Sequence, residues 1–215
     1  MNKTALIDEL ITASRTLYDR KLIHAAGGNT SVRGGDFVWI SQTGAELGKL
    51  TEDKIVKVDL QGNVLEGRAP SKEMAMHLAM YRARKNAHAV IHVHPTYSIA
   101  FSTLISRESN DVVPPYTMAF YVRAGRVPMI PYHPSGSHSL HEAVEALAPV
   151  HHAILLRQHG LIVAGADMST AIGVVEEVEQ CCQIAVATAL KGAPLTEAQL
   201  RAIDAGLGRS WDNVS

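Results

Sequence analysis

Residues 70–95, PSKEMAMHLAMYRARKNAHAVIHVHP, carry a helical pattern, a short connection and an apolar run in direct succession. Ser71 follows Pro70 and is a favourable N-cap, so we expect a helix to begin there. The apolar run that follows is typical of a buried strand, with His92 and His94 at its end. Successive side chains of a strand point to opposite faces, so these two imidazoles share one face. The stretch therefore predicts a helix and then a buried strand that carries two histidines on one side of its end.

Helical and strand patterns also alternate on both sides of this stretch. Further helices are predicted over about residues 3–22, 96–106, 137–149 and 169–192. One hairpin is predicted in residues 30–41 and a second in residues 55–67. A short strand is predicted in residues 127–132, and two more in residues 151–165, which turn at His159–Gly160. Because hairpins join several strands, the sheet should be mainly antiparallel or mixed. With no repeat or linker, residues 1–215 are expected to form one α/β domain that ends in a polar tail.

Composition excludes several classes of protein. The chain has 215 residues, of which 47% are hydrophobic and 19% charged, as in ordinary globular enzymes and unlike disordered proteins. Its net charge is −1, so we expect neither a nucleic-acid surface nor a basic membrane patch. Acidic and basic residues interrupt the first helical pattern, which is neither a signal peptide nor a membrane span. Cys181 and Cys182 are expected to be packed helix thiols, and a scaffold without disulfides suits the cytoplasm.

The histidines suggest a metal site. Catalytic zinc and similar ions typically have three protein ligands and one open position. His92 and His94 could supply two of these ligands, and His159, at the end of another apolar run and beside Gly160, is the best third candidate. The alternative is that these are solvated histidines at strand ends.

Glu73 lies just upstream of the histidine strand, in the first turn of the predicted helix. The helix dipole favours a carboxylate at such a position, which is one explanation for the residue. The other is a general acid or base that works beside a metal. His77, one turn further along, is expected to be either a helix-face residue or a partner behind the site.

Three turns of small residues could bind an anion. They are GGNTS at 27–31, TG at 43–44 and PSK at 70–72. Backbone N–H groups, hydroxyls and a helix N-terminus are the groups that bind phosphate in proteins. The alternative is that the glycines only form turns.

These motifs, in this order and spacing, resemble the class II aldolase/adducin family. The resemblance runs from the first helix to the cysteine-bearing helix, through GGNTSVR, TG, PSKEMAMHLAMYRARKNAHAVIHVHP and LLRQHGLIVAG. It implies a three-layer α/β/α domain around a mainly antiparallel sheet. It also implies a divalent metal, zinc in most members, held by His92, His94 and His159, with Glu73 as the catalytic carboxylate. The family's phosphate-binding positions fall on Asn29, Thr43, Gly44, Ser71 and Lys72. Members are typically cyclic homotetramers with active sites between subunits.

The family's active members are metal-dependent carbon–carbon lyases. They act on small phosphorylated sugars or sugar acids through a metal-stabilised enediolate, which Glu73 would protonate. The stretches PSK, GAELGKL, PPYT and VPMIPYHPSGS resemble the branch that decarboxylates 3-oxo-tetronate 4-phosphates, whereas TMAFYV departs from that branch at Met118 and Ala119. Tyr116 is expected to be either an acid or substrate contact, or an aromatic packed at a subunit interface. The alternatives are a ketose 1-phosphate aldolase of the fuculose-phosphate type, a metal hydrolase, and a non-catalytic adducin-like interaction module. A 4-epimerase is less favoured, because those members carry aspartate where Glu73 stands.

Overall fold

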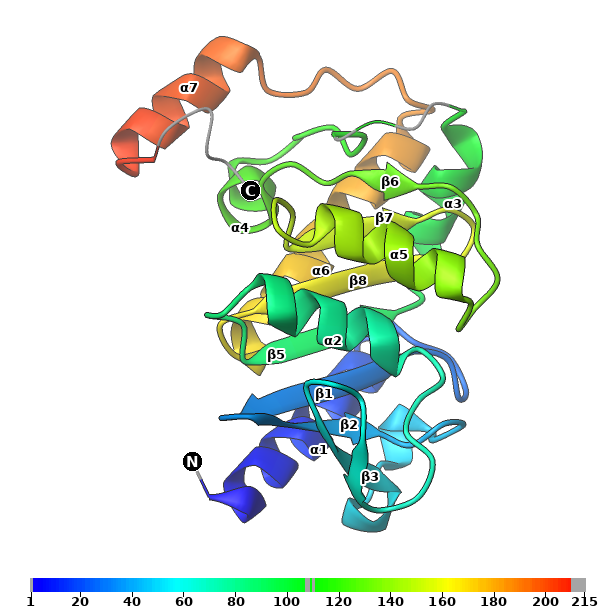
Figure 1. The fold of residues 1–215 in the computed structure, drawn as a ribbon. Coiled ribbons are helices and arrows are strands. Elements are labelled where there is room, and N and C mark those ends of the chain that lie inside the picture. The colour runs from blue at the N-terminus through cyan, green and yellow to red at the C-terminus, as the bar shows by residue number, and fades with distance from the viewer. Residues whose placement is uncertain (1, 107–108, 110, 210–215) are drawn as a thin grey trace.

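The fold is built on one mixed sheet of eight strands, as seen in a computed structural model that describes residues 2–106, 109 and 111–209. The strands are β1 (Asn29–Gly34), β2 (Phe37–Ser41), β3 (Ile55–Asp59), β4 (Val64–Glu66), β5 (Ala89–Val93), β6 (Met129–Ile130), β7 (Ala153–Leu156) and β8 (Gly160–Gly165). Their order is β4-β3-β2-β1-β5-β8-β7-β6 (Figure 1). Neighbouring strands run antiparallel except β6 and β7, which are parallel. The prediction of a mainly antiparallel sheet is confirmed.

Helices cover both faces of this sheet. The helices are α1 (Lys3–Asp19), α2 (Met74–Ala83), α3 (Thr96–Leu104), α4 (Met118–Ala124), α5 (His138–Leu147), α6 (Met168–Ala187) and α7 (Glu197–Gly206), with short 3-10 turns η1 (Leu47–Lys49) and η2 (Glu52–Lys54). Helices α2 and α5 lie on one face, and α1, α3, α4 and α6 pack on the other (Figure 1). The predicted three-layer α/β/α arrangement is therefore confirmed. None of the helices in the described part of the chain is long and apolar enough to span a lipid bilayer.

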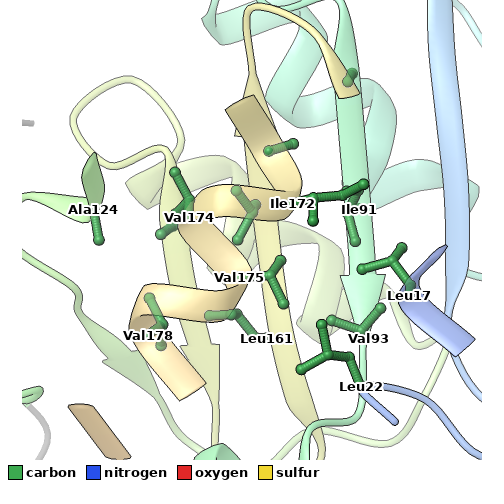
Figure 2. Close-up of a cluster of buried hydrophobic side chains, with 14 of the residues drawn as sticks. Leu17, Leu22, Ile91, Val93, Ala124, Leu161, Ile172, Val174, Val175 and Val178 are labelled. Carbon is green, nitrogen blue, oxygen red and sulfur yellow. The ribbon is translucent and has the colours of Figure 1, made fainter. Parts of the chain in front are cut away.

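Strand β5 lies in the middle of the sheet and is buried on both sides. Ile91 and Val93 point to the α6 face, where they join the core that Figure 2 shows around Ile172 and Val175. Val90 points to the other face and packs with residues of α2 and α5. Burial on both faces explains why the strand is almost continuously apolar. His92 alternates with Ile91 and Val93, so its side chain projects to the α2 face.

Helix α2 begins later than the sequence suggests. Its first residue is Met74, and Glu73 rather than Ser71 occupies the N-cap position. Ser71 donates its backbone N–H to Ser41 O, and an isolated bridge joins Pro70 to Gln42. The chain is thus held beside β2 and turns into the helix only after a turn at 71–73. Helix α1 likewise ends at Asp19 rather than near residue 22, because Lys21 has a φ of 60°, which is incompatible with a continuing helix.

The expected polar tail contains a helix, α7, that the sequence analysis missed. Thr196 and Gln199 form a capping box at its start, a local signal that TEAQ carries in the sequence. Leu200 and Asp204 are buried, and Tyr121 O–H donates to the Asp204 carboxylate at 2.7 Å. The tail is therefore anchored on α4. Residues 210–215 lie outside the described residues.

Candidate active site

Three histidines meet where β5 ends and β8 begins. His92 is the fourth residue of β5, His94 follows the strand, and His159 lies in the turn between β7 and β8. Because β5 and β8 pair directly, with Val93 opposite Leu161, the two ends share one edge of the sheet. The ring centroids are 4.8 to 5.2 Å apart, and one nitrogen from each ring lies within 4.8 Å of the others.

The three imidazoles fit a divalent metal. Such a site needs neutral rings whose lone pairs converge. Burial lowers the pKa of His92 well below its ordinary value, and burial together with the nearby His159 lowers the pKa of His94 to about 4. His92 Nδ1 lies 3.1 Å from the carbonyl oxygen of Leu161, so the N–H donates there. Its Nε2 therefore keeps a lone pair and lies 3.0 Å from His94 Nε2. The three converging imidazoles can thus hold a metal ion.

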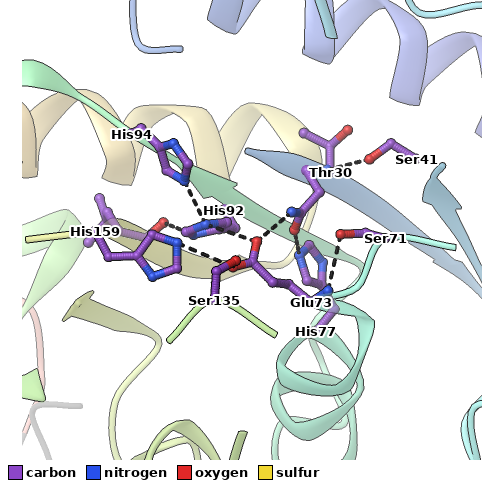
Figure 3. Close-up of polar contacts among 11 residues, drawn as sticks. Thr30, Ser41, Ser71, Glu73, His77, His92, His94, Ser135 and His159 are labelled. Carbon is purple, nitrogen blue, oxygen red and sulfur yellow. Dashed lines mark hydrogen bonds and ion pairs between the residues drawn. The ribbon is translucent and has the colours of Figure 1, made fainter. Parts of the chain in front are cut away.

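The carboxylate of Glu73 faces this cluster (Figure 3). Its oxygens lie 3.3 Å from His92 Nε2 and 3.2 Å from His159 Nε2. One oxygen accepts the Asn29 side-chain N–H at 2.9 Å, and the other accepts the Ser135 hydroxyl. Glu73 makes no side-chain capping bond to α2, so the carboxylate is turned away from the helix and toward the histidines.

The environment of Glu73 keeps it ionised. Burial raises its pKa, but hydrogen bonds from His159, Ser135 and Asn29 oppose that effect. The donors prevail, and the pKa of Glu73 lies well below its ordinary range. The site therefore combines neutral imidazoles with a buried, negatively charged carboxylate, which is a suitable combination for metal binding and proton transfer.

Two of the predicted phosphate-binding segments lie at one paired stretch of chain. The antiparallel bridge between Gln42 and Pro70 places Thr43 opposite Ala69 and Ser41 opposite Ser71, so the turn of Thr43 and Gly44 and the residues Ser71 and Lys72 continue from opposite ends of this pairing. Two of the backbone donors are already used, since Thr43 N–H binds Ala69 O and Ser71 N–H binds Ser41 O. A ligand here would instead meet hydroxyl groups and the exposed Lys72 ammonium.

Asn29 differs from the other predicted phosphate-binding residues because it contacts Glu73 directly. Its side chain is buried, with 5% of the residue exposed, and it bonds to Glu73 and His77. In this structure it belongs to the environment of the Glu73 carboxylate more than to an open anion site.

Close packing leaves no room for a Cβ atom at three glycines beside the histidines. A Cβ at Gly27 would lie 2.9 Å from His94 Nδ1, and one at Gly28 would lie 2.6 Å from His92 O. A Cβ at Gly160 would lie 2.3 Å from Val93 O and 2.9 Å from the ring of His94. The glycines of GGNTS, which suggested an anion cradle, are therefore explained by the approach of this turn to β5.

The first prediction follows from this packing. Gly160→Ala should displace the His94 ring and weaken zinc binding by roughly 10- to 100-fold, as is usual when the support of a ligand is lost. Zinc titration against a competing chelating dye measures the change. Gly206→Ala is the matched control, because a Cβ there meets nothing within 4 Å. Equal zinc affinity in both variants would contradict the role given to Gly160.

Comparison with known proteins agrees with this geometry. The sequence matches the family Class II Aldolase and Adducin N-terminal domain over residues 8–186. The chain belongs to this family. The expected resemblance is thereby confirmed over most of the chain.

Curated members of the family are similar over almost their whole length. The chain is 34% identical to the 3-oxo-tetronate 4-phosphate decarboxylase of Haemophilus influenzae, over 86% of this chain and 88% of that protein. It is 35% identical to the L-fuculose phosphate aldolase of Methanococcus maripaludis, over 83% and 94%. Both names describe lyases, which agrees with the expected class of enzyme.

Solved structures of family members share the fold. YgbL from Klebsiella pneumoniae superposes with a TM-score of 0.90 at 29% identity, covering 94% of this chain and 99% of that chain. An L-fuculose 1-phosphate aldolase superposes with a TM-score of 0.86 at 28% identity, covering 97% and 98%.

Tyr116 lies apart from the histidine cluster within one chain. Its N–H donates to Pro114 O, and its ring packs against Gly192 and the core on the α6 face. Among the described residues no hydrogen bond joins Tyr116 to Glu73 or to the three histidines.

Two residues around Glu73 were not predicted as site residues. Ser135 lies in the loop between β6 and α5, within the stretch VPMIPYHPSGS, whose resemblance to the decarboxylase branch was the available signal, and Gly136 packs this loop on Lys72. His77 was predicted only as a helix-face residue or a partner behind the site. It is fully buried, and its spacing of one helical turn from Glu73 was the available signal. Burial lowers the pKa of His77 to about 4, so the ring is neutral.

Proposed function

We propose that this chain is a metal-dependent carbon–carbon lyase that decarboxylates a 3-oxo-tetronate 4-phosphate, with zinc as the metal. The observation that carries the proposal is the convergence of three imidazoles beside the buried carboxylate of Glu73, which lies 3.3 Å from His92 Nε2 and 3.2 Å from His159 Nε2. The similarity to the decarboxylase of Haemophilus influenzae supports the choice of substrate.

The residues of the site divide into three roles in this proposal. His92, His94 and His159 would hold the metal. A bound divalent ion supplies a Lewis acid that stabilises negative charge on substrate oxygens. Glu73 would carry the proton: when the carbon–carbon bond breaks, the electron pair stays on the substrate and carbon dioxide leaves. Glu73 would take up a proton from solvent and deliver it to that carbon.

The substrate phosphate would be bound beside Glu73. Thr43, Gly44 and Lys72 are exposed to solvent, Ser71 lies buried next to Lys72, and Lys72 adds the positive charge that a phosphate dianion would need. This assignment supports a phosphorylated rather than a neutral substrate.

A second prediction tests this assignment. Lys72→Ala should raise KM on the order of 10-fold and leave kcat nearly unchanged, because the lost charge binds substrate without taking part in proton transfer. Steady-state kinetics measures both constants. Lys85→Ala, which removes an exposed lysine at the opposite end of α2, is the control. A fall in kcat at constant KM would instead assign a chemical role to Lys72.

The alternative is a ketose 1-phosphate aldolase, which the similarity to the Methanococcus maripaludis enzyme supports. One assay separates the two. Purified protein is incubated with a panel of 3-oxo-tetronate 4-phosphates and ketose 1-phosphates, and carbon dioxide and aldehyde are both measured. Carbon dioxide from a 3-oxo acid supports the proposal, and aldehyde release alone would replace it with the aldolase. If neither forms and the protein purifies without divalent metal, a non-catalytic module would be the better description.

We further propose that the protein acts in the cytoplasm as a cyclic homotetramer with active sites between subunits. Cys181 and Cys182 are free and buried, as expected in a reducing compartment. Tyr116, which is remote from the histidines of its own chain, would then act at a subunit interface. A monomeric mass in solution by light scattering would overturn the assembly.

A further inference from the structure

A continuous chain of buried polar groups runs behind Glu73. Asn29 Nδ2 lies 2.9 Å from a Glu73 oxygen, and Asn29 Oδ1 lies 2.5 Å from His77 Nε2. His77 Nδ1 lies 2.8 Å from Ser31 Oγ, which is 2.9 Å from the hydroxyl of Tyr81. All five residues are buried, and His77 and Ser31 have no exposed surface. Buried polar groups on this scale require that every donor meets an acceptor.

We propose that His77 is a positioning residue for Glu73, acting through the side-chain amide of Asn29. The inference rests on the proposed role of Glu73 as the proton carrier and adds a residue that the reaction never touches. It assigns a purpose to a fully buried histidine outside the metal cluster.

The direction of the hydrogen bonds follows from the Asn29 amide. Asn29 Nδ2 donates to Glu73 Oε2 at 2.9 Å, so its Oδ1 is turned away from the carboxylate. Asn29 Oδ1 then faces His77 and must accept, so the neutral ring carries its proton on Nε2. The remaining nitrogen, Nδ1, has a lone pair and accepts the Ser31 hydroxyl.

Tyr81 lies at the end of these hydrogen bonds that is farthest from Glu73. Its O–H donates to the backbone oxygen of Ser31 at 2.9 Å, and its hydroxyl oxygen lies 2.9 Å from Ser31 Oγ. The side chains of Ser31, His77 and Asn29 thus each donate toward Glu73. A flipped Asn29 would set an amide oxygen against the carboxylate, so these three bonds keep this direction.

This row of hydrogen bonds orients Glu73 but does not conduct protons to it. An amide N–H cannot pass its proton on under these conditions, so the link through Asn29 only fixes the geometry. One carboxylate oxygen, Oε2, is therefore committed to accepting from Asn29. The other oxygen, Oε1, accepts from the exposed Ser135 and lies 3.2 Å from His159 Nε2.

The test compares two substitutions of the same residue. In His77→Gln the new amide can donate to Asn29 and accept from Ser31, which preserves the direction of the chain. In His77→Leu both bonds are lost at similar volume. We expect the leucine variant to lose roughly 10- to 100-fold in kcat at nearly constant KM and metal content, and the glutamine variant to recover most of that loss.

A second measurement does not depend on turnover. In the metal-free protein, hydrogen exchange of the Asn29 side-chain N–H₂ group is followed by NMR. The exchange should be slow in the natural protein and in His77→Gln, and faster in His77→Leu. Tyr121→Phe is the control for the loss of a buried tyrosine hydroxyl, since the Tyr121 O–H donates to Asp204 and lies outside these hydrogen bonds. It should leave kcat and the Asn29 signal nearly unchanged.

The outcomes separate this inference from the proposed function. Slow Asn29 exchange that depends on His77, in a protein that turns over no substrate of the panel, would leave the positioning role intact and remove the proposed function. Unchanged kcat and unchanged Asn29 exchange in His77→Leu would overturn the role of His77. If that variant does not fold, Ser31→Ala tests the same link. Its Asn29 exchange should accelerate, and an unchanged rate would overturn the inference.

Discussion

Replacing His159 by alanine is expected to remove bound metal and activity together. The three histidine nitrogens lie within 4.8 Å of one another, and loss of one leaves two of the three proposed ligands. Structural and catalytic zinc sites use three or four protein ligands, so two should not hold the ion through purification. Without the Lewis acid the reaction loses several kcal/mol of stabilisation, on the order of 10³-fold in turnover. Metal content is measured by mass spectrometry of the purified protein, and turnover by the product assay.

His138→Ala is the matched control for the loss of a histidine. His138 is exposed at the start of α5 and pairs with Glu142 at the surface. This variant should keep the metal and the activity of the natural protein. If His159→Ala also keeps one metal per chain, His159 is not the third ligand and the proposed site must be revised.

Glu73→Gln is expected to stop the reaction while leaving the site assembled. The glutamine oxygen can accept from Asn29, and its N–H₂ can face Ser135, whose hydroxyl rotates to accept. The variant should therefore fold, retain metal and bind substrate. It should still lose on the order of 10²- to 10⁴-fold in turnover, which is the usual contribution of a positioned acid or base. Single-turnover kinetics on the metal-loaded protein separates this chemical defect from binding.

The competing explanation of Glu73, a favourable charge at the start of α2, predicts a different result. The loss would then be about 0.3–1 kcal/mol of stability, with turnover nearly intact. Glu197→Gln serves as the control, because Glu197 lies in the first turn of α7 and is remote from any histidine of the cluster. A Glu73 variant that behaves like this control, with a lowered melting temperature and normal turnover, would remove the proton-transfer mechanism.

Part of the fold and of the candidate site is determined by local patterns in the sequence. Alternation along a strand places His92 and His94 on one side of β5, whatever surrounds them. The same alternation, with glycine and asparagine at the turns, predicts the β1–β2 and β3–β4 hairpins. The capping box of α7 is equally local, and TEAQ contained it although the helix was not predicted. These features depend on residues only a few positions apart.

Other features depend on contacts that only the tertiary structure decides. Whether His159 meets His92 depends on the pairing of β5 with β8, whose residues are about 70 positions apart in sequence. Ser135 reaches Glu73 because its loop packs on Lys72, and Asn29 reaches His77 across 48 positions. The start of α2 was misplaced because hydrogen bonds to β2 hold Ser71 outside the helix.

The physical reason for this division is the range of the forces involved. Periodicity, caps and turns act within one or two turns of backbone, so a single sequence displays them directly. The packing of helices on both faces of the sheet determines which groups surround a buried polar side chain. Each buried donor then needs an acceptor among these neighbours. The sequence therefore determined which side chains could do chemistry, and the packing of α2 against β1 and β5 decided how Glu73 is held among them.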